Sequence, residues 1–169
     1  MRRIRPLLAA ALLSLSASGL AAQGNDAIHA EVFGPAILGS VNYERVVGGS
    51  FSGRVGVGWL PGFDIGSQLQ VPLMVNVLAG KGVHRVEVGG GAVLAYALSR
   101  GIEEAETVRP GWRRPHAAAT LAYRLEPGEA SAMHGGIYRV GLTPLFVDGR
   151  IYPSIVISAG AYLSAFGDR

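Results

Sequence analysis

The sequence has no cysteine among its 169 residues, so neither a disulfide framework nor a thiolate metal site is available to it. Charged residues are scarce at 16% and aromatic residues at 8%, whereas glycine is abundant with 25 residues. Beyond residue 22, glycine or a charged residue interrupts every apolar stretch before it reaches the roughly 20 residues that a membrane-spanning helix needs. The shortages exclude a disulfide-stapled fold and a helical membrane protein.

The first 22 residues have the three parts of a secretory signal peptide. Three arginines precede residue 6, an apolar run covers residues 6–15, and small residues follow up to Ala22. The apolar run is too short for a membrane anchor. We therefore expect export with cleavage after Ala21 or Ala22, which leaves residues 23–169 as one domain.

Removing this segment changes the charge balance. Of the 15 lysines and arginines, three lie in the predicted signal peptide, and all 12 acidic residues follow it, so the domain carries 12 basic and 12 acidic residues. The net charge of +3 therefore belongs to the export segment. We expect no nucleic-acid partner, because the domain has no excess of positive charge.

The most regular stretch runs from Leu69 to Leu98. Apolar residues occupy every second position from Leu69 to Val77, which is the period of a β-strand, and the pattern returns from Val86 to Tyr96. Between these arms, Ala79–Gly82 contains two glycines that can adopt the positive φ angles of a tight turn. The stretch is predicted to be a hairpin of two long strands.

Alternation elsewhere predicts six further strands, separated by turn residues and by one long loop. The predicted strands cover residues 27–33, 38–47, 52–60, 116–125, 136–146 and 152–166, and the loop covers residues 99–115. The total is eight, an even number and the smallest among bacterial outer-membrane barrels. Closure would also remove the exposed edges of such a β-rich chain. The fold predicted is all-β, an eight-stranded antiparallel up-and-down transmembrane β-barrel located in the bacterial outer membrane.

The two faces of the predicted strands differ in an informative way. One face is apolar and suits lipid, whereas the other combines glycine with charged residues and suits the narrow interior of a small barrel. Buried charges in such an interior must pair, because desolvation is costly. We therefore expect arginine and glutamate pairs to fill the lumen. The residues assigned to this polar ladder are His29, Glu31, Asn42, Glu44, Arg54, Gln70, Asn76, Arg85, Glu87, Arg124 and Arg139. The phase of the last strand stays open, since Tyr162 falls on the face opposite Ile155 and Ile157.

Four motifs occur in order along the domain. They are NYER at residues 42–45, PLxxN at 72–76, GxGxHxxExGxG at 80–91 and RxGxTPxF at 139–146. With these motifs the chain resembles a family of uncharacterised small eight-stranded outer-membrane β-barrel proteins of Bacteroidota type. The resemblance spans most of the domain and implies the barrel fold. The family has no assigned activity, so the resemblance implies no catalytic residue and no cofactor.

A soluble periplasmic barrel of lipocalin type, with an apolar ligand inside, is an alternative with the same strand pattern. It requires the faces to be inverted, with Val71, Leu73, Val86 and Val88 inside the barrel. The glycine-rich character of the charged face argues against this inversion.

A barrel enzyme that modifies lipid A is a second alternative. Such enzymes need a serine, a histidine and an acidic residue in one cluster, and the chain has four histidines: His29, His84, His116 and His134. No serine lies beside His116 at strand spacing, and the sequence contains no catalytic motif. We therefore expect a protein with a structural or surface-interaction role and without enzymatic activity, cofactor or metal.

The best candidates for ligand contact lie in the long predicted loop. They are Arg109, Trp112, Arg113 and Arg114. Arginine forks suit phosphate groups, including those of lipopolysaccharide, although the same arginines can simply balance the glutamates of this loop. The partners expected are outer-membrane lipid, among them lipopolysaccharide, and the barrel-assembly machinery during biogenesis. The barrel is expected to be a monomer.

Overall fold

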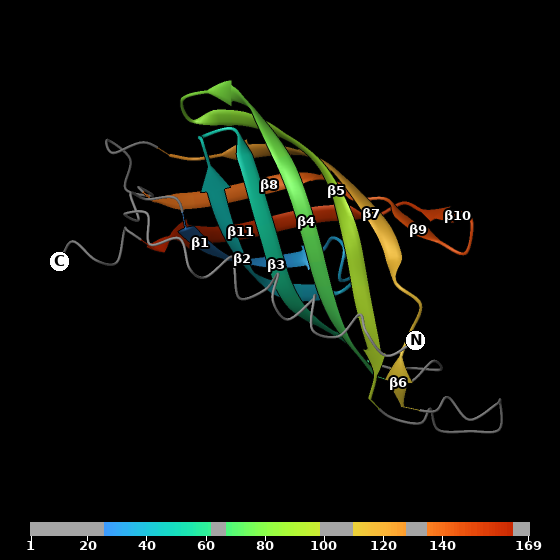
Figure 1. Ribbon diagram of the computed structural model, residues 1–169. Coiled ribbons are helices and arrows are strands. Elements are labelled where there is room, and N and C mark those ends of the chain that lie inside the picture. The colour runs from blue at the N-terminus through green and yellow to red at the C-terminus, as the bar shows by residue number, and fades with distance from the viewer. Residues whose placement is uncertain (1–25, 62–66, 99–109, 128–134, 164–169) are drawn as a thin grey trace, which may run out of the picture.

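The computed structural model describes residues 26–61, 67–98, 110–127 and 135–163 (Figure 1). The predicted signal peptide, residues 1–22, lies outside the described residues. All regular elements described are strands: β1 (Asp26–Phe33), β2 (Gly39–Val47), β3 (Phe51–Leu60), β4 (Gln68–Lys81), β5 (His84–Ala97), β6 (Gly111–Trp112), β7 (His116–Leu125), β8 (Gly136–Leu142), β9 (Leu145–Val147), β10 (Arg150–Tyr152) and β11 (Ile155–Tyr162). Within the described residues, no helix is long and apolar enough to cross a membrane.

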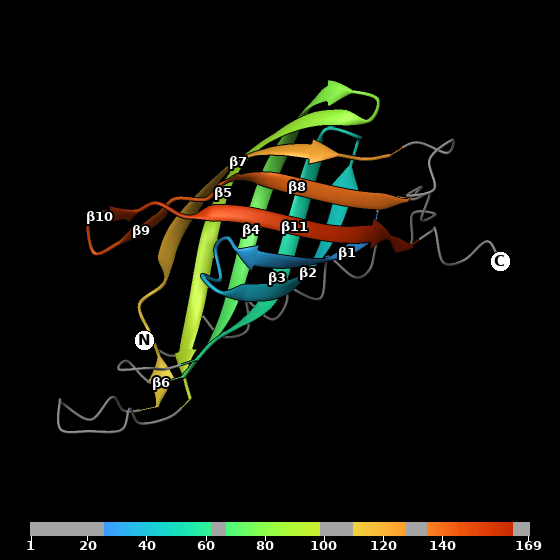
Figure 2. The same cartoon turned by 180° about the vertical axis from the view of Figure 1, so that it is seen from behind.

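Eight of these strands close into a barrel, which confirms the predicted all-β, eight-stranded antiparallel barrel. The order around the barrel wall is β1, β2, β3, β4, β5, β7, β8 and β11, and β11 pairs with β1 to close the ring. Figures 1 and 2 show the strands strongly tilted, so that the near and far walls cross. Such tilt is required to close a sheet of this size. The β9–β10 hairpin extends the wall beyond β7 and β8.

We call the end of the barrel at which β1 starts and β11 ends the terminal end, and the opposite end the far end. The turns after β2, β4 and β7 lie at the terminal end. The connections after β1, β3, β5 and β9 lie at the far end, and so does the β6 segment.

Two predicted strands are interrupted at prolines. The strand predicted over residues 136–146 is split into β8 and β9 around Pro144, and the strand predicted over residues 152–166 starts as β10 and continues as β11 after Pro153. Proline has no N–H to donate to the ladder, so pairing stops at both positions. Residues 164–166 of the last predicted strand lie outside the described residues.

Two other boundaries differ from the prediction. The hairpin arms pair as far as Lys81 and His84, so the turn consists of Gly82 and Val83 rather than residues 79–82. Gly82 takes the left-handed φ of 67° that the turn requires. The predicted loop 99–115 contains a short strand, β6, which pairs with the end of β5. Residues 99–109 of that loop lie outside the described residues.

The connection between β1 and β2 folds into the far end of the lumen. Pro35 is buried and Ala36 is fully buried, and the backbone of Phe33 and Ile37 adopts a φ of 65°. Left-handed backbone at such side chains costs of order 1–3 kcal/mol each, and surrounding contacts must hold it. A Cβ at Gly58 would lie 2.6 Å from Ala36 Cβ, so a glycine on β3 makes room for the inserted loop.

Candidate functional site

The interior of the barrel collects the residues of the predicted polar ladder. Ten of the eleven are buried with 0–4% exposure, and Arg85 is partly exposed near the terminal end. Because the exposed and buried residues alternate along each wall strand, these side chains point into the lumen while their neighbours point outward. The buried members are His29, Glu31, Asn42, Glu44, Arg54, Gln70, Asn76, Glu87, Arg124 and Arg139.

Arg139 on β8 joins two glutamates from other strands. Its Nη2 lies 2.5 Å from Glu31 Oε2, and its Nη1 lies 2.9 Å from Glu87 Oε1. Arg54 approaches the same carboxylates from β3, at 3.0 Å from Glu31 and 3.9 Å from Glu87. Two arginines thus share two glutamates, and the four residues come from four strands.

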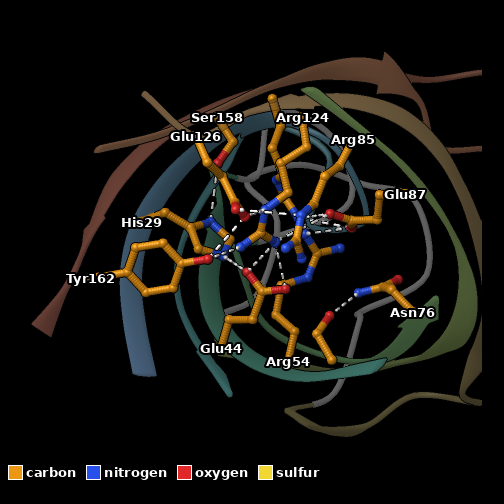
Figure 3. Close-up of polar contacts among 12 residues, drawn as sticks. His29, Glu44, Arg54, Asn76, Arg85, Glu87, Arg124, Glu126, Ser158 and Tyr162 are labelled. Carbon is orange, nitrogen blue, oxygen red and sulfur yellow. Dashed lines mark hydrogen bonds and ion pairs between the residues drawn. The ribbon is translucent and has the colours of Figure 1, made fainter. Parts of the chain in front are cut away.

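Arg124 on β7 is the centre of a second group of polar contacts. Its Nη1 donates to both carboxylate oxygens of Glu44 at 2.8 Å, and its Nε donates to Glu126 at 2.6 Å. Its Nη2 reaches the hydroxyl of Tyr162 at 3.2 Å, and that hydroxyl donates to Glu126 at 2.8 Å. Glu87 lies 3.6 Å away and connects this centre to the first one. Figure 3 shows these side chains meeting inside the ring of strands.

We name the six residues Glu31, Glu44, Glu87, Arg54, Arg124 and Arg139 the polar plug. Their side chains are 0–1% exposed. Three positive charges meet three negative charges, so the plug is electrically balanced. Removing these groups from water is costly, and the short contacts offset that cost. Some polar atoms, among them Glu31 Oε1 and Arg54 Nη2, have no protein partner among the described residues and are suited to bind buried water.

Glycines on the inner face give the long polar side chains their space. A Cβ at Gly56 would lie 2.1 Å from Asn42 Oδ1, and a Cβ at Gly89 would lie 2.0 Å from Asn76 Oδ1. The two asparagine amides donate to serine hydroxyls at 2.9 and 3.3 Å. The mixture of glycine and polar residues on one face is therefore a packing requirement of a narrow lumen.

His29, Ser158 and Glu44 form a serine–histidine–glutamate arrangement that sequence reasoning missed. Ser158 Oγ lies 3.0 Å from His29 Nδ1, and His29 Nε2 lies 3.6 Å from Glu44 Oε2. The three residues are 0–4% exposed, and Glu44 already accepts hydrogen bonds from Arg124. A catalytic triad needs an exposed nucleophile beside an oxyanion site. This buried set instead links β1, β2 and β11.

Glu126 and Tyr162 were also missed. Glu126 lies just after β7, where the sequence predicts a turn, and its carboxylate accepts hydrogen bonds from Arg124 and Tyr162. Tyr162 settles the phase of the last strand, because its side chain lies inside with Ser158 while Ile155 and Ile157 are exposed. Strict alternation from Ile155 would have given this phase.

The structure places the predicted ligand residues in different environments. Arg109 lies outside the described residues. Trp112 on β6 points outward and packs edge-on against Tyr96, with ring centroids 5.2 Å apart. Arg113 and Arg114 border a cavity at the far end of the lumen. Contact of these arginines with lipopolysaccharide stays a prediction.

Of the other histidines, His84 bonds Tyr123 on the outer face at the terminal end, and His116 borders the far cavity. His134 lies outside the described residues. Among the residues described, no group of three histidine or acidic side chains is arranged to hold a metal ion.

No family model matches the chain, and neither a curated protein nor a solved structure is significantly similar to it. The resemblance to small outer-membrane barrels of Bacteroidota type therefore stays a prediction.

Proposed function

We propose that this chain is a small outer-membrane β-barrel protein with a filled lumen and a structural or surface-interaction role. The observation that carries the proposal is a belt of exposed apolar side chains to which every strand of the barrel wall contributes. Representative members, in order from β1 to β11, are Val32, Val41, Val57, Val75, Val88, Leu121, Val140 and Ile157, with 49–66% exposure.

The belt is continuous across the wall. Val88 pairs with Leu121, and Leu121 pairs with Leu142. Val140 pairs with Ile157, which pairs in turn with Val32. Soluble monomers rarely expose contiguous apolar surface of more than a few hundred Å², whereas a lipid-facing wall requires it.

Polar and aromatic residues border the belt at its two ends. At the far end, the register places Trp59, Leu69, Tyr96 and Trp112 in one row across β3 to β6. At the terminal end, the exposed side of the wall carries the Asp26–Arg45 ion pair at 2.7 Å. Tyr43 donates to the same aspartate at 2.9 Å. Aromatic girdles at both interfaces are typical of outer-membrane barrels, and this arrangement supports that location.

The orientation of the two faces argues against the lipocalin alternative. That alternative needs Leu73 and Val88 inside, whereas they are 38% and 50% exposed and the charged face lies in the lumen. The balanced polar plug blocks the lumen and favours a closed barrel over a channel. We propose no enzymatic activity, because the serine–histidine–glutamate set formed by Ser158, His29 and Glu44 is buried. The barrel would act as a monomer, with membrane lipid as its main partner.

The test is to separate the soluble periplasmic, inner-membrane and outer-membrane fractions, and to run boiled and unboiled samples on a denaturing gel. Enrichment in the outer membrane with a heat-dependent mobility shift is expected. Recovery as a soluble protein would contradict the proposal.

Two arginine substitutions sharpen this test. Val75→Arg lies in the middle of β4, and Val47→Arg lies at the terminal end of β2, with 66% and 60% exposure of the native valines. In a bilayer the first should cost about 2–4 kcal/mol and the second about 0–1 kcal/mol. Equal, small costs at both sites, measured by urea unfolding, would contradict a lipid-facing wall.

A further inference from the structure

The far half of the lumen contains a cavity that neither the polar plug nor the apolar belt explains. Its volume is about 560 Å³, which lies within the range of small-molecule sites, about 300–1,000 Å³. Its walls are largely apolar and come from the inserted β1–β2 loop, from β3, from β5 and from the β9–β10 hairpin. The apolar residues that matter here are Ile37, Leu60, Ala95, Leu145, Val147 and Tyr152.

An apolar cluster borders this cavity. Met74, Val93, Ala118 and Leu145 are 0–4% exposed and form one packed cluster, and Leu145 also lines the cavity. The cluster therefore gives the cavity an apolar wall on the side of Leu145. Its other boundary includes exposed residues of the barrel end, so the pocket opens outward there.

One polar side chain in the pocket is buried without its full set of partners. Gln70 is 1% exposed, lines the cavity, and its Oε1 has no hydrogen-bond partner among the described residues. A buried unpaired amide oxygen costs about 1–3 kcal/mol. Because the two ends of an amide side chain are interchangeable by rotation, Gln70 can present either a donor or an acceptor to a ligand.

The register places Ala95 between Gln70 and a cationic residue, Arg113. Gln70 pairs with Ala95, and the backbone N–H of Arg113 donates to Ala95 O at 2.8 Å. On the next level, His116 pairs with Val93, and its Nε2 also lacks a partner within the described residues. The small side chain of Ala95 thus leaves space between the amide of Gln70 and the segment that carries Arg113.

The charged residues around the pocket favour an anion. Two arginines, Arg113 and Arg114, line it, against one acidic residue, Asp148. The Arg114–Asp148 pair is 3.9 Å long, and its side chains are 87% and 74% exposed. Such an exposed pair contributes little, so Arg114 can exchange this partner for the anionic group of a ligand.

We propose that the far-end pocket binds a single-chain amphiphile with an anionic head group. The hydrocarbon chain would occupy the apolar walls formed by Leu60, Leu145 and Val147. The head group would accept hydrogen bonds from Arg114, which would exchange Asp148 for it, and from Arg113 and Gln70. The pocket belongs to the lumen, so this inference goes beyond the proposed membrane role and does not depend on it.

The experiment uses the full domain in phosphatidylcholine nanodiscs, or in buffer if the protein is recovered as soluble. Isothermal titration with decanoate is compared with decyltrimethylammonium, which has the same chain and the opposite charge, and with acetate, which has no chain. Empty nanodiscs correct for partition into lipid. Saturable one-to-one binding of decanoate, about tenfold or more tighter than that of the cation, and no binding of acetate are expected.

Variants locate the site. Arg113→Gln should weaken decanoate binding about tenfold, whereas Arg150→Gln, an exposed arginine of β10 outside the pocket lining, should leave it unchanged. Ala95→Leu should abolish binding by filling the gap. The heat-dependent gel shift shows whether Ala95→Leu folds. If it does not fold, Ser154→Phe, which blocks the pocket from its rim, replaces it as the blocking variant.

Equal affinities for the anionic and cationic chains would overturn the proposal, and so would unchanged binding in a folded blocking variant. Binding of acetate as tight as that of decanoate would also overturn it, because the site would then be a simple anion site. Fractionation tests the membrane location separately, so failure of one proposal is distinguishable from failure of the other.

Discussion

The two halves of the lumen differ in how completely side chains fill them. In the middle of the barrel and toward its terminal end, long arginine and glutamate side chains from six strands meet and fill the space. In the half toward the far end, the inner positions hold shorter residues, such as Ala95 and Ala97 on β5 and Ala118 on β7. A cavity of about 560 Å³ lies there.

The length of the side chains on the inner wall therefore determines whether the lumen is filled or left open at a given level. Along β5, the inner face changes from Glu87 through Gly89 and Gly91 to Val93 and Ala95. The same strand therefore helps to close the lumen at one level and leaves it open at another. Eight strands give an interior just wide enough for either outcome.

Breaking the plug should have the largest effect. Arg124→Met would remove the guanidinium that donates to both carboxylate oxygens of Glu44 at 2.8 Å and would leave this buried carboxylate without its arginine partner. Loss of one partner from a buried ion pair costs about 3–5 kcal/mol. Urea unfolding in lipid vesicles, followed by the fluorescence of Trp59 and Trp112, measures the free energy of unfolding.

The matched control for this variant is the double substitution Arg124→Met with Glu44→Gln. It removes the uncompensated charge and should recover part of the lost stability. A loss below about 1 kcal/mol in the single variant would mean that water reaches the plug.

A neighbouring pair of glycines tests how tightly the inner face is packed. A Cβ at Gly89 would lie 2.0 Å from Asn76 Oδ1 and 2.5 Å from Val75 O, whereas at Gly90 the nearest atom would lie at 3.4 Å. Gly89→Ala should therefore cost about 1–3 kcal/mol. Gly90→Ala, which points outward, should stay within about 0.5 kcal/mol of the native protein. Similar losses at both glycines would contradict the assignment of the faces.

These contrasts also show what the sequence alone could predict. Alternation predicted the eight strands, the closed barrel and the inward position of residues such as Glu87 and Arg139, because a period of two depends only on local order. It could not say which arginine meets which glutamate, since Arg139 and Glu31 are far apart in the chain. The missed breaks at Pro144 and Pro153 follow from ordinary proline chemistry and were predictable.

The pocket was beyond sequence reasoning for a different reason. It arises where the small side chain of Ala95 lies between Gln70 on the neighbouring strand and Arg113 on a segment predicted to be a loop. The inserted β1–β2 loop, which brings Ile37 to the same cavity, left no sequence signal beyond Gly34 and Pro35.

The hydroxyl of Tyr162 tests the edge of the plug, and a smaller effect is expected. This hydroxyl donates to Glu126 at 2.8 Å and accepts from Arg124 at 3.2 Å. Tyr162→Phe should cost about 1–2 kcal/mol, because a hydrogen bond with a charged group is lost. Tyr138→Phe on the outer side of β8 is the control. Equal effects of the two substitutions would place Tyr162 outside the network.

The smallest effect is expected in the far half, where the sign should reverse. Gln70 is 1% exposed with an unpartnered Oε1, so Gln70→Leu removes a buried polar group that is not fully satisfied and keeps a similar volume. Without ligand, the free energy of unfolding should stay unchanged or rise by up to about 1 kcal/mol. The same kind of change in the plug, from a polar to an apolar side chain at Arg124, should lower it by several times that amount. A loss of more than about 1 kcal/mol in Gln70→Leu, measured by the same urea unfolding, would mean that Gln70 holds the wall together. The far half would then contribute to stability as the plug does, and the contrast between a filled half and an open half would be wrong.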